Sequence, residues 1–158
     1  MDFELRDETA ADEGFLERLF VEGRAGEFAP LGLGAEQLAG LMAMQARAQR
    51  MGYSGNYPAA KRSVVWVEGR AVGRMIVDYG ERVVTLVDVA LLEEFRGRGI
   101  GGRLVEGVCR EAEGAGKVVR LSVKRCNRAK NLYERAGFKV CGEDALQFEM
   151  EFCPRRDG

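Results

Sequence analysis

The stretch from Val89 to Leu104 constrains the fold of this chain more than any other. An apolar segment runs directly into a loop that carries two arginines and four glycines, and the loop opens into a segment with helical periodicity. Glycines leave the backbone amides unshielded, and the first N–H groups of a helix point at one spot with the positive end of the helix dipole behind them. Arginine side chains add charge-assisted hydrogen bonds there, and the candidates are Arg96, Arg98 and Arg103. The stretch therefore predicts a site for a pyrophosphate or a similar group.

Two familiar phosphate motifs fit this loop poorly. Gly97, Gly99 and Gly102 satisfy the dinucleotide pattern G-x-G-x-x-G, but that pattern also needs an acidic residue at the end of the next strand, and residues 121–124 contain none. The strand before the loop is also the third in a row joined by short turns, unlike the start of a Rossmann unit. A P-loop is excluded because no Gly-Lys-Ser/Thr follows. A plain glycine-rich turn that caps a helix remains the simplest alternative.

A second motif lies further along the chain. Residues 127–138 read N-x-A-x-x-L-Y-x-x-x-G-F, which matches N-x-x-A-x-x-L-Y-x-x-x-G-F from its alanine onward with Asn127 one position nearer, and Arg96-x-x-Gly99-x-Gly101 precedes them by one helix and one strand. Together the two motifs resemble the signatures of the GNAT superfamily of acetyl-CoA-dependent N-acetyltransferases, in particular its small bacterial members. The resemblance covers nearly the whole chain.

The predicted elements have the order of that fold. Periodicity and turn signals favour strands at residues 3–6, 64–67, 71–78, 83–91, 118–123, 138–141 and 145–152. They favour helices that start near Thr9, at 35–51, at 100–114 and from Cys126 to Gly137, with a loop over Gly23–Gly34. The resemblance implies an α/β (α+β) GNAT fold, with a mixed sheet of about seven strands flanked by about four helices. We expect a single domain over residues 1–153 and a polar tail over 154–158.

The resemblance also implies where the cofactor binds. In this fold the strands expected at 83–91 and 118–123 are parallel but splay apart, partly because of a bulge in the first, and pantetheine fills the slot like an extra strand. The pyrophosphate would lie on the amides from Gly97 to Gly102. Asn127 would bind pantetheine or cap the next helix, and both roles stay open. The expected acetyl-CoA contacts are Leu91, Leu92, Arg96, Gly97, Arg98, Gly99, Ile100, Gly101, Gly102, Arg103, Asn127 and Tyr133.

Acyl transfer needs a neutral amine, a stabilised oxyanion and a proton for the departing thiolate. A backbone N–H near Leu91 can serve the oxyanion. Tyr133 matches the general acid of many family members, and we expect its neighbour Leu132 to fill the core face of the helix. Asp88 and Glu93 are the two candidates for the base. Many family members have proline where this chain has Glu93.

The acceptor site has the least motif content. Leu38, Leu41, Met42, Gln45 and Gln49 share one face of the second helix, so the glutamines either line a pocket or turn toward solvent as the face ends. Tyr53 and Tyr57 are predicted in a loop, as a rim of the acceptor site or as packing.

Composition excludes several classes of protein. A net charge of −1 and a pI near 5.7 give no basic field for nucleic acid or an anionic membrane. The chain has no histidine, and its four cysteines form no C-x-x-C pair, so we expect no metal site and no histidine-based catalysis. No leader or spanning segment is visible, which predicts a cytoplasmic protein. A homodimer is possible because dimers are common in the family that the chain resembles.

Three functions follow as hypotheses. The first is acetyl transfer from acetyl-CoA to a primary amine of a small molecule, by direct attack in a ternary complex. The second has a protein N-terminus or lysine as the acceptor. The third is a non-catalytic CoA-binding sensor.

Overall fold

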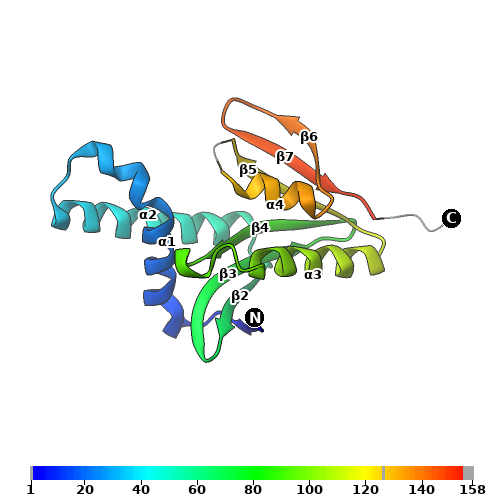
Figure 1. Ribbon diagram of the computed structural model, residues 1–158, viewed down its shortest axis with the longest axis horizontal. Helices are drawn as coiled ribbons and strands as arrows, with labels where there is room; N and C mark the ends of the chain where they lie inside the picture. The colour runs from blue at the N-terminus through cyan, green and yellow to red at the C-terminus, as the bar shows by residue number, and fades with distance from the viewer. Residues whose placement is uncertain (1, 126, 155–158) are drawn as a thin grey trace.

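A mixed sheet of seven strands forms the centre of the molecule. The computed structural model describes residues 2–125 and 127–154. The strands lie in the order β1-β2-β3-β4-β5-β7-β6, and every neighbouring pair is antiparallel except β4 and β5, which are parallel (Figure 1). The strands are β1 (Glu4–Asp7), β2 (Lys61–Val67), β3 (Arg70–Tyr79), β4 (Val83–Leu91), β5 (Val118–Lys124), β6 (Lys139–Glu143) and β7 (Gln147–Phe152). The helices are α1 (Glu13–Phe28), α2 (Ala35–Asn56), α3 (Ile100–Gly114) and α4 (Ala129–Arg135). This arrangement confirms the predicted GNAT fold and its order of elements.

Helices α1 and α2 are longer than predicted. The expected loop over Gly23–Gly34 is wrong, because α1 continues to Phe28 and a 3-10 turn follows at Ala29–Leu31. Glycine inside a helix costs only about 1 kcal/mol relative to alanine, and the packing of α1 against α2 and the sheet outweighs that cost. Likewise α2 runs five residues past its predicted end to Asn56, just before Tyr57 and Pro58, since the residue before a proline disfavours helical dihedrals.

One helix face was predicted residue by residue. The buried residues of α3 are Ile100, Leu104, Val105, Val108, Cys109 and Ala112, as the periodicity indicated. They pack on the side of the sheet to which β3 contributes Met75 and Val77. Because side chains alternate along a strand, Arg74 of β3 faces the opposite side, where α2 lies. The predicted start of the last helix at Cys126 is outside the described residues.

Strands β4 and β5 pair only at their beginnings. Their register joins Val83 to Val118, Val84 to Val119 and Thr85 to Arg120, after which no pairs form between them among the described residues, although both strands continue. On the other edge of β4, Asp88 lies opposite Ile76 and Leu86 opposite Val77, so Val87 is an extra, bulged residue. The splay and the bulge confirm two features that the resemblance implied, and they leave a slot between the strands.

Candidate active site

The loop between β4 and α3 needs glycine for its backbone conformation. Gly97 and Gly99 have φ angles of 74° and 84°, in the left-handed region that residues with a Cβ rarely adopt. Gly99 is the N-cap of α3, so the amides of the first helical turn have no partner within the helix. A Cβ added to Gly101 or Gly102 would lie 3.7 Å from a methyl group of Leu132 in α4. The N-terminus of α3 and the slot beside it thus form a cradle of exposed amides that suits a pyrophosphate.

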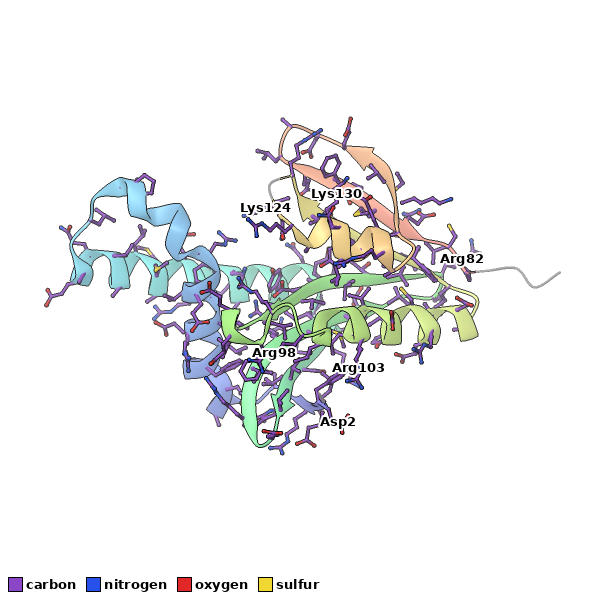
Figure 2. The ribbon with its side chains drawn as sticks, viewed as in Figure 1. Asp2, Arg82, Arg98, Arg103, Lys124 and Lys130 are labelled. Carbon is purple, nitrogen blue, oxygen red and sulfur yellow. The ribbon has the colours of Figure 1, made fainter. Side chains whose placement is uncertain are left out.

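The three predicted arginines have different positions. Arg96 donates from Nε to the carbonyl of Leu91 at 3.1 Å, which ties the loop to the end of β4. The guanidinium of Arg98 lies 5.3 Å from the centre of the Phe95 ring, beside the loop. Arg103 instead lies 4.8 Å from the Phe3 ring, on the side of α3 away from α4 (Figure 2).

The structure therefore does not bring Arg103 to the loop, contrary to the prediction. Arg103 and Gly107 are one helical turn apart and line the same surface groove of about 200 Å³. A Cβ on Gly107 would meet nothing within 4 Å, so that face of α3 is open beside Arg103.

Leu91 and Leu92 at the end of β4 differ in where their main-chain groups point. The N–H of Leu92 donates to the carbonyl of Val72 in β3 at 2.8 Å, and its carbonyl accepts from the amide of Phe95 at 2.9 Å. The predicted contact of Leu92 with the cofactor is therefore wrong, because the sheet and the following turn already use both groups. Hydrogen-bonding direction alternates along an antiparallel pair, so the N–H of Leu91 points away from β3 and into the slot.

Tyr133 combines a buried ring with an open hydroxyl. The residue is 8% exposed, and its ring centre lies 5.8 Å from that of Phe138 in the core. Leu132 is only partly buried, so the expectation that it fills the core face in place of Tyr133 is wrong. The Tyr133 hydroxyl makes no hydrogen bond to a described residue, yet no fully buried side-chain oxygen or nitrogen lacks a partner in that part of the chain. The Tyr133 hydroxyl therefore opens onto accessible space.

The environment of Tyr133 keeps its hydroxyl protonated. Burial raises the pKa of Tyr133 to about 12, and the negative charge of Asp88 adds to the effect. A phenol with this pKa carries its proton at neutral pH. Tyr133 is thus in the form that a proton donor requires, in the electrostatic field of a carboxylate that was predicted as the base.

Asp88 directly follows the bulge and is held by a buried arginine. Arg74, whose side chain is 5% exposed, donates to Oδ2 of Asp88 from Nε at 3.0 Å and from Nη2 at 2.6 Å. Both hydrogen bonds end on the same oxygen. Oδ1 of Asp88 accepts none from a described residue, and it is not among the fully buried atoms, so it is open to solvent.

Glu93 and Asn127, two further predicted residues, lie at the ends of the loops. Glu93 is exposed and begins a 3-10 turn, and its backbone N–H donates to Oε2 of Glu22 at 3.4 Å. Oδ1 of Asn127 accepts from the amide of Ala129 at 2.9 Å, so this side chain satisfies the first amide of α4 from the position before the N-cap residue Arg128. A contact of Asn127 with pantetheine stays a prediction.

Three side chains complete the polar surroundings of Asp88. Gln49 of α2 accepts from Nη2 of Arg74 at 3.0 Å, which decides between the two interpretations of this glutamine in favour of an inward position. Tyr53 lies beside them, with its ring centre 5.6 Å from Cζ of Arg74. Burial raises the pKa of Tyr53 to about 12, and the charge of Asp88 raises it further while that of Arg74 opposes it. Arg74 itself was missed from the sequence, although a charged residue inside the apolar run 72–77 was a visible signal.

The family of the chain follows from a direct match. The family model of the acetyltransferase (GNAT) domain matches residues 61–140, which is 80 of the 158 residues. The chain belongs to the GNAT acetyltransferase family, and it is an acetyl-CoA-dependent acyltransferase. No curated protein matches it.

Solved structures share the fold over its whole length. The PaiA N-acetyltransferase from Thermoplasma acidophilum, solved in complex with coenzyme A, superposes with a TM-score of 0.72 at 19% identity, covering 97% of this chain and 99% of its own. Ard1 from Thermoplasma volcanium gives 0.65 at 17% identity, covering 99% and 100%. The ribosomal-protein-S18-alanine N-acetyltransferase from Escherichia coli gives 0.62 at 16% identity, covering 99% and 97%. In the part of the chain that the structure describes, no helix is long and apolar enough to cross a membrane.

Proposed function

We propose that this enzyme transfers an acetyl group from acetyl-CoA to a primary amine of a small molecule, by direct attack in a ternary complex. One observation carries the proposal. Asp88 has an open oxygen where β4 bulges and separates from β5, and its charge helps to raise the pKa of Tyr133, whose hydroxyl is also open. A base and an acid are thus available in one site beside the slot.

The residues that would hold the cofactor are those of the slot and the loop. The amides from Gly97 to Gly102 suit the pyrophosphate, Arg96 and Arg98 lie beside them, and the N–H of Leu91 opens onto the slot for pantetheine. Bound there, acetyl-CoA supplies the thioester whose acetyl group is transferred. The positive φ angles of Gly97 and Gly99 support this fit. They favour glycine, which has no side chain to cover the amides that the phosphates would approach.

Each proton of the reaction has a group to handle it. The acceptor ammonium loses one proton to solvent to become the neutral amine, and Asp88 takes a second proton from the nitrogen as it attacks the thioester carbon. The Leu91 N–H donates to the oxyanion as the carbon–nitrogen bond forms. Tyr133 gives its proton to the sulfur as the carbon–sulfur bond breaks. Glu93 remains the alternative base, working through water because it is exposed at the mouth of the loop.

The described residues near Asp88 offer no nucleophile for a covalent intermediate. The chain has no histidine. Cys109 is buried in α3, and burial raises its pKa to about 11. Cys141 lies in the edge strand β6, where its thiol donates to the carbonyl of Glu149 at 3.5 Å, and Cys153 follows β7. Among residues 2–125 and 127–154, this distribution of thiols supports direct attack.

A protein amino group is the second candidate acceptor. Leu31 before α2 and Leu146 between β6 and β7 are 58% and 77% exposed, so two segments that border the acceptor region in this fold carry apolar side chains open to a partner. Among the structures of similar fold, the enzyme from Escherichia coli acts on an alanine of ribosomal protein S18.

An acceptor screen with matched partners tests the proposal. Thiol release from acetyl-CoA would be followed with a simple alkylamine, a diamine, an aminoglycoside and a peptide with a free α-amine, and products identified by mass spectrometry. We expect N-acetylation of at least one small amine, with intersecting initial-velocity lines. Acetylation of the peptide alone would support the second candidate. Parallel lines with an acetylated enzyme would contradict direct attack, and tight CoA binding without turnover would favour the sensor hypothesis.

A further inference from the structure

We propose that Arg74, held by Gln49, is a positioning residue that turns Oδ1 of Asp88 toward the acceptor nitrogen, and that the Tyr53 hydroxyl is the second contact of that nitrogen. This inference rests on the proposed function and gives it an acceptor subsite. The subsite favours primary amines, because a neutral primary amine has one N–H for each of the two acceptor oxygens.

Burying the guanidinium of Arg74 in the sheet is energetically costly. Arg74 lies in the middle of a buried strand, and a guanidinium in such a place is unfavourable unless carboxylate and neutral acceptors surround it. Both kinds of partner are present, from β4 and from α2: Asp88 accepts two of its hydrogen bonds and Gln49 accepts a third. The core of a strand does not require such a residue for packing, since a methyl-bearing side chain would fill it. Its effect is to fix one carboxylate.

The two hydrogen bonds from Arg74 also fix the orientation of the Asp88 carboxylate. Because both hydrogen bonds from Arg74 end on Oδ2, the planar group of Asp88 cannot rotate without losing them, and Oδ1 is held in the open position. The bulge at Val87 places Asp88 where β4 leaves its partner β5. For a base in acyl transfer, a fixed orientation toward the acceptor nitrogen matters more than a particular basicity.

Tyr53 lies beside the pair of Arg74 and Asp88. Its ring lies against Arg74, its hydroxyl makes no hydrogen bond to a described residue, and that oxygen is not among the fully buried atoms. Tyr53 and Asp88 both contact Arg74, so the phenol and the carboxylate lie side by side. The phenol oxygen can accept one N–H of the acceptor while Oδ1 accepts another.

The chemistry then favours a primary amine. At the moment of attack a neutral primary amine directs its lone pair at the thioester carbon and has two N–H groups, one for Oδ1 of Asp88 and one for the Tyr53 oxygen. A neutral N-methyl amine has only one N–H, so its methyl group would lie against one of the two oxygens. Binding a methyl group there would leave a polar atom without a partner, which discriminates strongly.

The test uses Arg62 as a matched control. Arg62 of β2 also ties a strand to α2, because its Nη2 donates to Oγ of Ser54 at 2.8 Å, and it also faces a carboxylate, with Nη1 3.9 Å from Oε2 of Glu8. Arg62→Met therefore removes a similar tie without touching Asp88. Its acetyl-CoA affinity and its kinetics with the best amine of the screen should stay within about twofold of the wild type.

Arg74→Met should keep the dissociation constant of acetyl-CoA within about twofold and lower kcat/KM for the amine by about 100-fold, the size expected when a catalytic group is misplaced by about an ångström. Arg74→Lys should recover part of this loss, because lysine keeps the positive charge but cannot donate two parallel hydrogen bonds from a planar group. If Arg74→Met fails to fold, Gln49→Met, which keeps the ion pair, should still raise KM for the amine several-fold without changing acetyl-CoA binding. Equal kinetics for the variants of Arg74 and Arg62 would overturn the inference.

Tyr53→Phe tests the second contact. The wild type should prefer the primary amine over its N-methyl analogue by about 100-fold, and Tyr53→Phe should reduce that preference about tenfold while Tyr79→Phe, on the α3 side of the sheet, leaves it unchanged. An unchanged preference in Tyr53→Phe would remove Tyr53 from the subsite. Absence of any amine turnover by the wild type, with acetyl-CoA bound, would overturn the proposed function and this inference together, and thus differs from every variant-specific failure.

Discussion

The proposed cofactor side and the proposed acceptor side of this enzyme are built by different means. On the cofactor side, β4, the loop, α3 and the start of α4 offer main-chain groups: the amides after Gly97 and the N–H of Leu91. On the acceptor side, side chains from α2, β3 and β4 converge, and the ion pair of Arg74 with Asp88 is the centre. A main-chain site depends on local conformation, whereas a side-chain site depends on which strands and helices meet.

The difference teaches where such an enzyme can change. Acetyl-CoA is common to the family, and a site of backbone amides preserves its shape whatever the surrounding side chains. The acceptor surroundings can be rebuilt by substituting single residues such as Gln49 or Tyr53, without disturbing the loop. Substitutions on the two sides should therefore have separable effects on acetyl-CoA affinity and on turnover.

The largest effect should come from the loop. Gly99→Val forces a branched side chain into a φ of +84° and covers the amides, so we expect affinity for acetyl-CoA to fall at least about 100-fold. Gly116→Val is the matched control, since Gly116 also has a positive φ of 69° and a Cβ there meets nothing within 4 Å. Equilibrium dialysis measures both, with circular dichroism as the check on folding. Equal affinity in the two variants would break the assignment of the loop.

The next effect should appear in turnover alone. Tyr133→Phe removes the proposed proton donor while keeping the ring, so kcat should fall by about 100-fold and acetyl-CoA affinity should hold. Tyr79→Phe is the control, because Tyr79 donates to Glu111 on the α3 side of the sheet. Steady-state kinetics with the best amine decide the matter. Unchanged kcat in Tyr133→Phe would exclude it as the acid.

An alkaline effect should follow from the same phenol. The folded protein has a Tyr133 pKa of about 12 against 10.0 for the ordinary phenol, so between these pH values the unfolded chain loses a proton that the folded chain keeps. The free energy of unfolding should therefore be fully retained below pH 10 and fall as the pH rises toward 12. Tyr133→Phe should reduce the loss by about 1–2 kcal/mol in urea titrations at pH 9 and pH 11.5. Identical losses in both proteins would argue against burial of the phenol.

The smallest effect should be at the cap of α4. Asn127→Ala removes the hydrogen bond to the Ala129 amide and should cost about 1 kcal/mol of unfolding free energy, whereas Asn131→Ala, exposed on the same helix, should cost less. Calorimetric titration with acetyl-CoA then separates the two roles of Asn127. A loss of stability alone means a cap, and an added loss of affinity means a contact with pantetheine as well.

The sequence predicted the cofactor side better than the acceptor side, for physical reasons. The strand Val83–Leu91, the loop and the buried face of α3 are local patterns of glycine and apolar spacing, and the structure reproduces them. The predicted cofactor contacts of Arg103 and Leu92 failed. They depend on which face of the helix a side chain occupies and on which edge of the strand a main-chain group points to.

On the acceptor side the failure had another cause. Arg74 and Gln49 are 25 residues apart and meet only through the packing of α2 on the sheet. Tyr53 was predicted in a loop because neighbouring glycines suggest a break, but α2 continues through them. No local pattern reports a contact of this kind.

The most direct test of the account is a calorimetric titration of the purified protein with acetyl-CoA, with CoA and with the dephospho form of CoA. We predict binding of acetyl-CoA and CoA with dissociation constants on the order of micromolar, and retention of most of this affinity by the dephospho form, because the pyrophosphate amides provide the main contact. A folded protein that binds none of the three would contradict the assignment of the slot and the loop.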